Sequence, residues 1–526
     1  MAIPWFFYSS PLTPHSSLLT VLGVPVAGLR VLVAASEVVG FAKTGGLADV
    51  AGALPAALAR RGNIVSVVMP FYNAVRDSAA VIERTGIVLP VPMGNRVLAC
   101  RVFRSHLPNT DVPVFLIEHA PYFERDNPAT KRGLYQEQIG RDKRDYGDNG
   151  ERFVFFCRAV MELVPHLGFP PDVIHANDWQ TGLIPAYLAE THRNNPGYQR
   201  IRSVFTVHNI AYQGSYPREL LNYTGLPAHL YNPGQLEHYG LNFLKAGVVF
   251  ADAVTTVSPT YAREIQTREF GEGLEGLLTN LHWKLSGIVN GCDYEHWNPA
   301  HDRHIAAPYT PETVFENKPL CKADLQRRFK LPEDPAVPVL GVIARLVAQK
   351  GIDIILSAAK GFLDLGCQIV VLGDGDRAFH DRLQSLRDAF PDQIAIYLGF
   401  NETLAHAVEA GSDLFLMPSR YEPCGLNQMY SLKYGTPPVV RSTGGLADTV
   451  VNATEENLAD RRATGFSFQD YSASALYETV KWALTLYRDR PADFRQVMLT
   501  AMAQDWSWDR SAEVYERLYR KITGLA

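Results

Sequence analysis

Short runs of apolar, often β-branched residues alternate with amphipathic stretches along most of this chain, and this alternation constrains the fold more than any other feature. Residues 32–35 form the first run, residues 47–61 carry apolar side chains at helical spacing, and residues 64–69 form the next run. A strand, a helix and a second strand in this order predict a βαβ unit with a right-handed connection. The chain is therefore expected to be an α/β protein.

The same pattern continues and then begins again in the second half of the chain. Further strands are predicted at residues 114–118, 173–175, 203–206 and 253–257, and a second set at residues 339–343, 368–372, 395–398, 414–417 and 438–440. In the second set a helix opens at residues 350–360, and Gly, Asn and Pro gather between the two sets at residues 290–299. We therefore predict two consecutive doubly wound sheets, with ligand at the carboxyl ends of their strands.

Composition excludes several classes of function. The chain has 526 residues and a net charge of −5, which provides no overall attraction for nucleic acid. Its six cysteines are scattered without a Cys-x-x-Cys pair, which argues against a disulfide framework or a zinc site and favours the cytoplasm. Residues 1–29 hold four prolines and no charged side chain. They are predicted to be a loose extension, with a weak targeting segment as the alternative and no membrane-spanning helix.

Two loops that follow predicted strands share a motif. Residues 44–50 read TGGLADV and residues 443–449 read TGGLADT, each where a strand gives way to a helix. Gly-Gly before an amphipathic run either is simply a good start for a helix or presents free backbone N–H groups to an anion. In the first copy Lys43 adds a charge, and Gly45 and Gly46 allow a ligand to approach the backbone.

Cations and a carboxylate follow two strands of the second half. Arg345 and Lys350 come directly after the strand at residues 339–343, where a guanidinium fork and a compact ammonium suit a diphosphate. Glu422 follows the strand at residues 414–417 and precedes a helix start marked by Pro423. This carboxylate is predicted either to hold sugar hydroxyls or a developing positive charge, or only to compensate the helix dipole.

Two clusters in the first half combine histidine, amide and aromatic side chains at predicted strand ends. Residues 175–180 read HANDWQ and residues 206–214 read TVHNIAYQG. These side chains are typical of sites that bind a sugar ring. Singly, His175 and His208 each suit a satisfied core histidine, but two such clusters in one half favour a binding site.

The chain closely resembles bacterial glycogen synthases and plant starch synthases, glycosyltransferase family five. The resemblance is carried by the following segments in their order: KTGGLADV, HANDW, FTVHNIAYQG, NFLKAG, VSPTYAREI, VNGCDYEHWNP, RLVAQKG, SRYEPCGLNQ and STGGLADT. The resemblance implies a GT-B fold, in which two Rossmann-like doubly wound domains face each other across a cleft and a C-terminal helix crosses back to the N-domain. The implied parts are the extension 1–29, an acceptor-side domain 30–298, a nucleotide-sugar domain 299–505 and the returning helix 506–526.

The resemblance also implies roles for individual residues. The catalytic residues are His208, Arg345, Lys350 and Glu422. The donor-binding residues are Lys43, Gly45, Gly46, Asp49, Gly399, Phe400, Leu426 and Asn427. The sugar and acceptor pocket consists of Glu37, Asp178, Asn209, Asn242, Cys424 and Gly425. No cofactor and no metal are expected, since the cations of the donor site would neutralise the departing diphosphate.

The implied reaction transfers glucose from ADP-glucose to the non-reducing end of an α-1,4-glucan, glycogen or starch, with retention of the anomeric configuration. UDP-glucose is the alternative donor, because Phe400 and Asn427 stand where Tyr and Thr are common and flank the nucleotide. An inactive glucan-binding scaffold on the same fold is the second alternative. Glu422 resembles a holder of sugar hydroxyls more than a nucleophile, which favours front-face substitution over double displacement. A homo-oligomer is left open.

Overall fold

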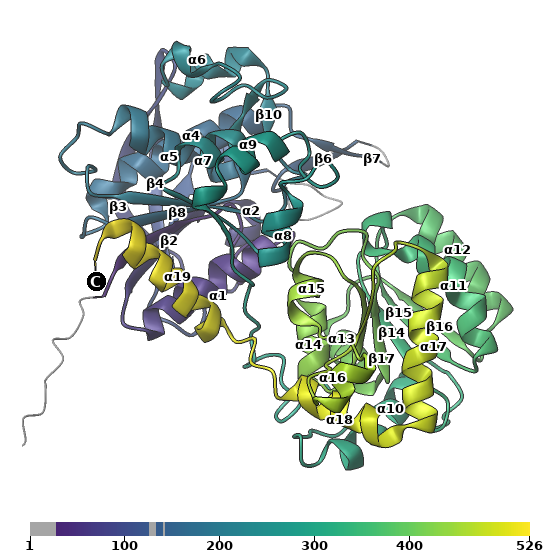
Figure 1. Ribbon diagram of the computed structural model, residues 1–526. Helices are drawn as coiled ribbons and strands as arrows, with labels where there is room; N and C mark the ends of the chain where they lie inside the picture. The colour runs from purple at the N-terminus through teal and green to yellow at the C-terminus, as the bar shows by residue number, and fades with distance from the viewer. Residues whose placement is uncertain (1–27, 126–132, 140–141, 526) are drawn as a thin grey trace, which may run out of the picture.

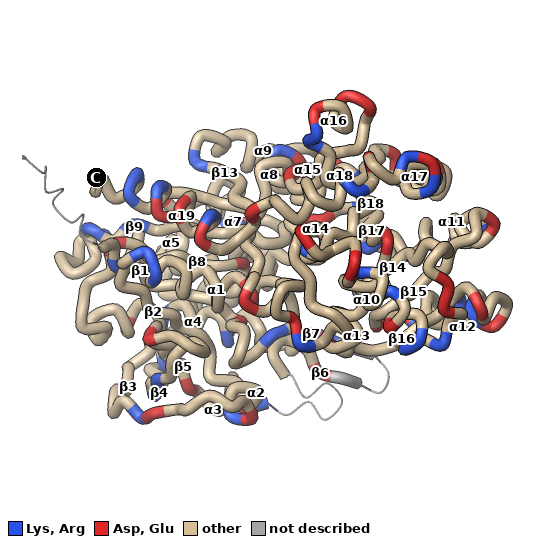
Figure 2. The backbone as a smooth tube through the Cα atoms, turned by 90° about the horizontal axis from the view of Figure 1, so that it is seen from below, with Lys and Arg blue, Asp and Glu red and all other residues tan. Residues whose placement is uncertain are grey.

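The computed structural model describes residues 28–125, 133–139 and 142–525 and forms two α/β lobes (Figure 1). Most of the extension predicted at residues 1–29 lies outside the described residues. Lys and Arg alternate with Asp and Glu along both lobes, so neither lobe presents a single sign of charge in this view (Figure 2). Within the described part of the chain, every helix is too short or too polar to cross a bilayer.

The N-terminal lobe is built on a nine-stranded sheet with the order β13-β12-β9-β8-β1-β2-β5-β4-β3. Its strands are β1 (Arg30–Ala34), β2 (Ile64–Pro70), β3 (Glu83–Met93), β4 (Arg96–His106), β5 (Pro113–Glu118), β8 (Val173–Asn177), β9 (Arg202–Val207), β12 (Ala253–Thr256) and β13 (Leu285–Gly287). All neighbours from β13 to β5 pair in parallel, as the alternating pattern predicts.

The β3–β4 hairpin is not among the predicted strands. It pairs antiparallel with β5 and extends the sheet at one edge. Pro90 and Pro92 lie within β3 and hide its strand pattern, but they are tolerated because β3 is an edge strand, whose outer side needs no donors. Two further short strands, β6 (Gln136–Ile139) and β7 (Asp142–Asp145), form a separate antiparallel pair.

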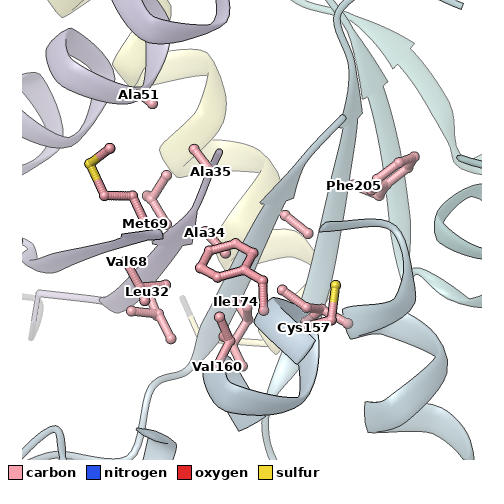
Figure 3. Packing of buried hydrophobic residues seen from close by; sticks show 14 of the residues in the cluster. Leu32, Ala34, Ala35, Ala51, Val68, Met69, Cys157, Val160, Ile174 and Phe205 are labelled. Atoms are coloured by element: carbon pink, nitrogen blue, oxygen red, sulfur yellow. The ribbon is translucent and has the colours of Figure 1, made fainter. Parts of the chain in front are cut away.

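Helices pack on this sheet and bury its apolar side chains. The main ones are α1 (Gly46–Arg60), α4 (Asn149–Leu163), α7 (Phe243–Phe250) and α8 (Pro259–Glu264). Leu32 of β1, Val68 of β2 and Ile174 of β8 lie close to Val160 of α4 within one continuous core (Figure 3). Because these strands are buried on both faces, they read in the sequence as unbroken apolar runs.

The C-terminal helix returns to the N-terminal lobe, as predicted. This helix, α19 (Trp508–Thr523), lies beside α1, and Asp509 and Glu516 pair with Arg60 and Arg61 at 2.9 and 2.7 Å (Figure 1). Its Tyr519 hydroxyl lies 2.8 Å from Nδ1 of the buried His175. Nε2 of His175 contacts the Thr206 hydroxyl, so His175 is a satisfied core residue and not part of a site.

The C-terminal lobe contains a six-stranded sheet in which all neighbours pair in parallel, in the order β16-β15-β14-β17-β18-β19. The strands are β14 (Val339–Ile343), β15 (Gln368–Gly373), β16 (Ile394–Leu398), β17 (Leu414–Met417), β18 (Pro438–Arg441) and β19 (Phe466–Phe468). The surrounding helices are α10 (Val314–Arg328), α11 (Ile352–Asp364), α12 (Arg377–Ala389), α13 (Glu402–Gly411), α14 (Asn427–Lys433), α15 (Gly444–Thr449), α16 (Glu455–Ala459), α17 (Ala473–Asp489) and α18 (Pro491–Met502).

Helix α11 begins two residues later than the sequence predicts. Residues Ala348–Lys350 form a single 3₁₀ turn, and Gly351 then takes a left-handed conformation with φ +75°. A Cβ atom at Gly351 would lie 2.2 Å from the carbonyl oxygen of Pro418, so only glycine fits this turn. The turn keeps Lys350 out of the helix and in the loop after β14.

Hydrogen bonds join the lobes where α8 meets α15 (Figure 1). Asp448 of α15 accepts bonds from the hydroxyls of Ser258 and Thr260 at 2.5 and 2.6 Å. Glu264 of α8 accepts bonds from the Thr443 hydroxyl and the Gly444 N–H at 2.9 and 3.0 Å. The two lobes are therefore in direct polar contact beside the linker.

Candidate active site

Each sheet has one point at which its strand order reverses, and several of the predicted residues lie on loops beside these points. Asn242 lies instead on the short strand β11 (Leu241–Asn242), and Gly399 and Phe400 follow the edge strand β16. In the C-terminal sheet β14 has β15 on one side and β17 on the other. In the N-terminal sheet β1 has β2 on one side and β8 on the other. Open parallel sheets bind ligands at the carboxyl ends of strands at such a point, in the crevice there. The loops after β1, β8, β14 and β17 therefore define the candidate site.

The loop after β1 is ordered by the buried carboxylate of Glu37. This carboxylate accepts bonds from the N–H and hydroxyl of Thr44 at 2.5 and 2.6 Å and from the N–H of Gly45 at 3.1 Å. The Tyr135 hydroxyl donates a further bond at 2.9 Å. Glu37, which was predicted to lie in the sugar pocket, therefore shapes this loop. Its carboxylate also accepts the hydrogen bond of the Gly45 N–H, the group predicted to face the donor.

The start of α1 leaves open space beside a cation. A Cβ atom built on Gly45 or Gly46 meets nothing within 4 Å, and neither residue has a positive φ, so packing does not demand glycine at either position. Lys43 lies next to them and pairs with Asp49 at 2.6 Å. Burial raises the pKa of Asp49, and the charge of Lys43 opposes this rise. An exposed ammonium at an open helix N-terminus is suited to an anion.

Lys350 and Glu422 form a nearly buried ion pair between the loops after β14 and β17. Lys350 Nζ lies 2.5 Å from Glu422 Oε2, and the two side chains are only 18% and 7% exposed. The Ser419 hydroxyl donates to the same oxygen at 3.0 Å. Glu422 therefore holds the ammonium at the reversal point of the C-terminal sheet, which places a positive charge where a ligand would bind.

Arg345 lies on the same loop as Lys350 but is exposed. Its guanidinium donates to the Gln349 side chain at 3.2 Å, and Gln349 in turn donates to the carbonyl oxygen of Tyr421. No carboxylate pairs with Arg345 among the described residues. Its charge is therefore available to an anion that enters beside Lys350.

His208 follows β9 and is almost completely buried. Its backbone N–H donates to Asp178 at 2.7 Å, and its ring Nε2 lies 3.0 Å from Asn177 Oδ1. Burial lowers the pKa of His208 to about 3, so the imidazole is neutral at pH 7. It acts at this position as a polar, uncharged wall.

Asp178, directly after β8, has an unusual backbone conformation. Its backbone φ angle of 57° lies in the left-handed region, which residues other than glycine rarely adopt. Burial raises its pKa to about 7, although the N–H groups of His208 and Asn209 stabilise the ionised form. Such strain and a perturbed carboxyl at a strand end are typical of functional sites. Both features were invisible in the sequence.

Asn242 has a structural role in the fold. It is fully buried and caps α7, because its Oδ1 accepts the N–H of Lys245 at 2.7 Å. Its amide nitrogen donates to the side chains of Gln213 and Ser215, both at 2.8 Å. Both amide protons are therefore in use within the fold, although Asn242 was predicted to line the sugar and acceptor pocket. Asn209, by contrast, hydrogen-bonds to Tyr421 of the other lobe, so the loops of the two lobes meet here.

The remaining predicted residues lie on loops of the C-terminal lobe. Gly399 follows β16 with φ +138°, and the next side chain, Phe400, is 81% exposed. Leu426 precedes α14, and Asn427 begins it and donates to the Ile343 carbonyl oxygen at the end of β14. Cys424 is buried, and burial raises its pKa to about 12.

The second TGGLAD copy does not present free N–H groups. The Gly444 N–H is bonded to Glu264, and the Gly445 N–H lies 3.1 Å from the carbonyl oxygen of Glu422. A Cβ atom on Gly444 would lie 2.0 Å from that carbonyl oxygen, so the glycine is needed for packing. This copy supports the loop of Glu422, as Gly425 does with φ +74° in the same turn. In the first copy Glu37 likewise takes the Gly45 N–H, so the anion-binding interpretation there depends on Lys43 and on the open space beside Gly46.

Three contributors to the site are absent from the predicted set. Ser419 and Tyr421 lie inside the SRYEPCGLNQ segment, where a hydroxyl beside Glu422 was a usable signal. Tyr135 reaches Glu37 across almost a hundred residues of sequence, and no local pattern marks it. Only the packing of its loop against the end of β1 brings it there.

Two doubly wound sheets, each with a cation on a loop beside its reversal point, and a C-terminal helix that returns to the first lobe are the features of a glycosyltransferase of the GT-B class. Family models for the starch synthase catalytic domain and for group 1 glycosyl transferases match residues 30–280 and 324–497. The chain belongs to the glycogen synthase and starch synthase family, and its activity is that of a glycogen-synthase glucosyltransferase.

Curated relatives and solved structures agree with this membership. The glycogen synthase of Rhodopirellula baltica is 44% identical over 94% of this chain and 98% of its own length, and that of an Anaeromyxobacter species is 46% identical over 94% and 99%. The catalytic domain of Arabidopsis thaliana starch synthase IV, bound to ADP and acarbose, superimposes with a TM-score of 0.85 at 31% identity and covers 94% of this chain and all of that chain. A sucrose-phosphate synthase from Thermosynechococcus elongatus shares the fold alone, with a TM-score of 0.54 at 18% identity, over 95% of this chain and all of its own.

Proposed function

We propose that this chain transfers glucose from ADP-glucose to the non-reducing end of an α-1,4-glucan, with retention of the anomeric configuration. The starch synthase IV domain of the same fold was solved with ADP and acarbose, which supports an adenosine donor and an oligosaccharide acceptor here. The Lys350–Glu422 pair at the reversal point of the C-terminal sheet is the observation that carries the proposal. The negatively charged diphosphate of a nucleotide sugar would require the positive charge of Lys350 at that place.

Three cations are assigned to the donor diphosphate. Lys350 is held by Glu422, Arg345 lies on the same loop, and Lys43 stands at the open start of α1 in the other lobe. Since they come from both lobes, closure of the cleft would complete the site. Their charge stabilises the diphosphate as it leaves, which is the usual work of preorganised cations in group transfer. No cofactor takes part in this proposal, and a metal ion is not needed in it.

Front-face substitution is the mechanism that we propose. The bond between glucose and the diphosphate breaks while the acceptor hydroxyl attacks from the same side, and the leaving phosphate oxygen takes the hydroxyl proton. Glu422 is bound to Lys350 and Ser419, so its carboxylate is engaged as an anchor and not poised as a free nucleophile. Neutral His208 lines the wall near the sugar without opposing the developing positive charge. A glucosyl group trapped on Glu422 would refute this mechanism.

The test compares initial rates of glucose transfer to glycogen from ADP-glucose and from UDP-glucose, each with and without a chelator. Faster turnover with ADP-glucose that survives the chelator is expected. Preference for UDP-glucose would refute the donor assignment and direct attention to Phe400 and Asn427. Loss of rate on chelation that added Mg²⁺ restores and added Zn²⁺ does not would refute the assignment of the diphosphate to protein cations alone. No turnover with either donor, in a folded chain that binds glycogen, would show a scaffold instead of an enzyme.

A further inference from the structure

Three side chains that could bind a metal ion meet where the linker between the lobes touches the C-terminal lobe. His296 lies on the interlobe linker, residues 288–313 between β13 and α10, while Glu402 and His406 are one turn apart on α13. One ligand atom from each of the three lies within 4.8 Å of the other two. His296 Nε2 already contacts Glu402 Oε1 at 2.6 Å. None of the three belongs to the donor site described above.

His406 has a buried ring nitrogen without a partner. The side chain is fully buried, and its Nδ1 lies 2.7 Å from Asp302 Oδ2. The Nε2 atom has no hydrogen-bond partner among the described residues. A buried polar atom without a partner costs free energy, and the His296–Glu402 contact does nothing to satisfy it. An additional group that accepts the lone pair of Nε2 would remove this cost.

Asp302 prepares His406 to act as a ligand. Asp302 Oδ2 also accepts a hydrogen bond from the Tyr434 hydroxyl at 2.5 Å, which fixes the carboxylate beside His406. When the Nδ1–H group donates to this carboxylate, the lone pair of the imidazole lies on Nε2. Histidines that bind metals commonly have such a carboxylate on their other nitrogen, which orients the ring.

Aromatic stacking fixes the ring of His406 from the side. Trp297, the neighbour of His296, stacks on His406 with ring centroids 3.8 Å apart and planes inclined by 7°. The ring of Trp297 also stacks on Tyr430, with ring centroids 4.3 Å apart. Stacking covers the face of the imidazole and leaves its edge, which carries Nε2, for a ligand. The same stack holds the linker beside α13.

We infer that His296, Glu402 and His406 bind a divalent metal ion of the zinc class. Two imidazoles and one carboxylate are ligands that zinc and its neighbours accept, whereas magnesium and calcium prefer oxygen ligands. A tetrahedral ion with three protein ligands keeps one position for water. The bound ion would fasten the interlobe linker to the start of α13.

The present geometry requires one small adjustment. Ligand atoms around tetrahedral zinc stand about 3.3 Å apart when the metal–ligand distances are about 2.05 Å. His296 and Glu402 must therefore separate from their 2.6 Å contact. Their side chains are 40% and 51% exposed, so both are free to rotate toward solvent. His406 stays in place, because Asp302 and Trp297 hold it.

Metal binding to the full-length chain, purified without a histidine tag and treated with a chelator, tests the inference. Zn²⁺ is titrated by calorimetry, and Co²⁺ serves as a probe whose visible absorption reports ligand geometry. One equivalent is expected to bind and to raise the Tm. His296→Ala and Glu402→Gln should each weaken binding by at least about tenfold. Both sites of substitution are exposed, so folding should survive.

The matched control is His301→Ala, which removes another exposed histidine of the same linker. This variant should bind metal as the unsubstituted chain does. Absence of stoichiometric binding to the unsubstituted chain would overturn the inference. Undiminished binding by His296→Ala would also overturn it, since the metal would then be held elsewhere. These readouts do not depend on glucose transfer, so they stand or fall apart from the proposed activity.

Discussion

Replacing Lys350 by methionine tests both the catalytic role of its charge and its structural role in the ion pair with Glu422. Lys350 Nζ contacts Glu422 Oε2 at 2.5 Å in a nearly buried pair, so the substitution removes a positive charge and also strands a carboxylate. Loss of one preorganised charge contact in the transition state lowers kcat by about 10²–10³-fold. Breaking a buried pair costs about 3–5 kcal/mol, which partial exposure of Lys350 reduces to about 2 kcal/mol.

The double variant Lys350→Met/Glu422→Gln distinguishes the two effects. With the carboxylate neutralised, the free energy of unfolding should recover most of its loss, because no charge is left buried alone. The kcat should stay at least about 10²-fold low, because the diphosphate still lacks its cation. Lys360→Met, on the exposed side of α11 beside Asp364, is the matched control and should change neither quantity.

The assays are initial rates at saturating ADP-glucose and glycogen, and urea unfolding of each variant. The assignment of Lys350 to the diphosphate would be refuted if the folded Lys350→Met chain kept a kcat within about threefold of that of the unsubstituted chain. Such a difference corresponds to a change in the activation barrier of under about 1 kcal/mol. Full recovery of kcat in the double variant would equally refute it, since activity would then depend only on the stranded carboxylate.

Three further predictions concern other parts of the site. Asp178 has a pKa of about 7 in the fold against 3.8 in the unfolded chain, so the native state holds more protons between these values and ionisation destabilises it as pH rises. Asp178→Asn should therefore raise the free energy of unfolding by about 1–3 kcal/mol more at pH 8 than at pH 5, and an equal change at both pH values would contradict the cause. Gly46→Ala should leave the free energy of unfolding within about 0.5 kcal/mol yet lower kcat/KM by about 10²-fold. Gly444→Ala, whose new Cβ atom would clash with a carbonyl oxygen, should unfold at lower urea concentration. An unchanged kcat/KM in Gly46→Ala would exclude the start of α1 from the donor site. Phe400→Tyr should shift the ratio of ADP-glucose to UDP-glucose rates without changing Tm, because this side chain is 81% exposed, and an unchanged ratio would exclude it as a donor determinant.

The candidate site was predictable wherever its residues follow a strand directly. Parallel strands end at one edge of their sheet, so residues just after β1, β9, β14 and β17 must gather there. His208, Lys350 and Glu422 were found in this way, whereas Lys43 was found by the Gly-Gly segment that follows it. The β3–β4 hairpin escaped because prolines within an edge strand imitate a loop.

Partners far apart in sequence could not be predicted. Nothing local joins Tyr135 to Glu37, or His296 to Glu402 and His406, because these contacts depend on how loops and a linker pack. The two TGGLAD segments show the same limit. Their sequences are nearly identical, yet one is open and the other is packed against the Glu422 loop.

The sequence by itself determined the two α/β halves and the order of the motifs, since apolar periodicity is set by neighbouring residues. The return of the C-terminal helix to the first lobe was implied only by the family resemblance. Only the tertiary structure decided which polar groups are free and which are already satisfied. Asn242 became a helix cap, Asp178 acquired a raised pKa, and His406 kept a nitrogen that has no partner within the described parts of the chain. Hydrogen bonding and burial are properties of the assembled surroundings, so the chemistry of each side chain is settled when the lobes have folded.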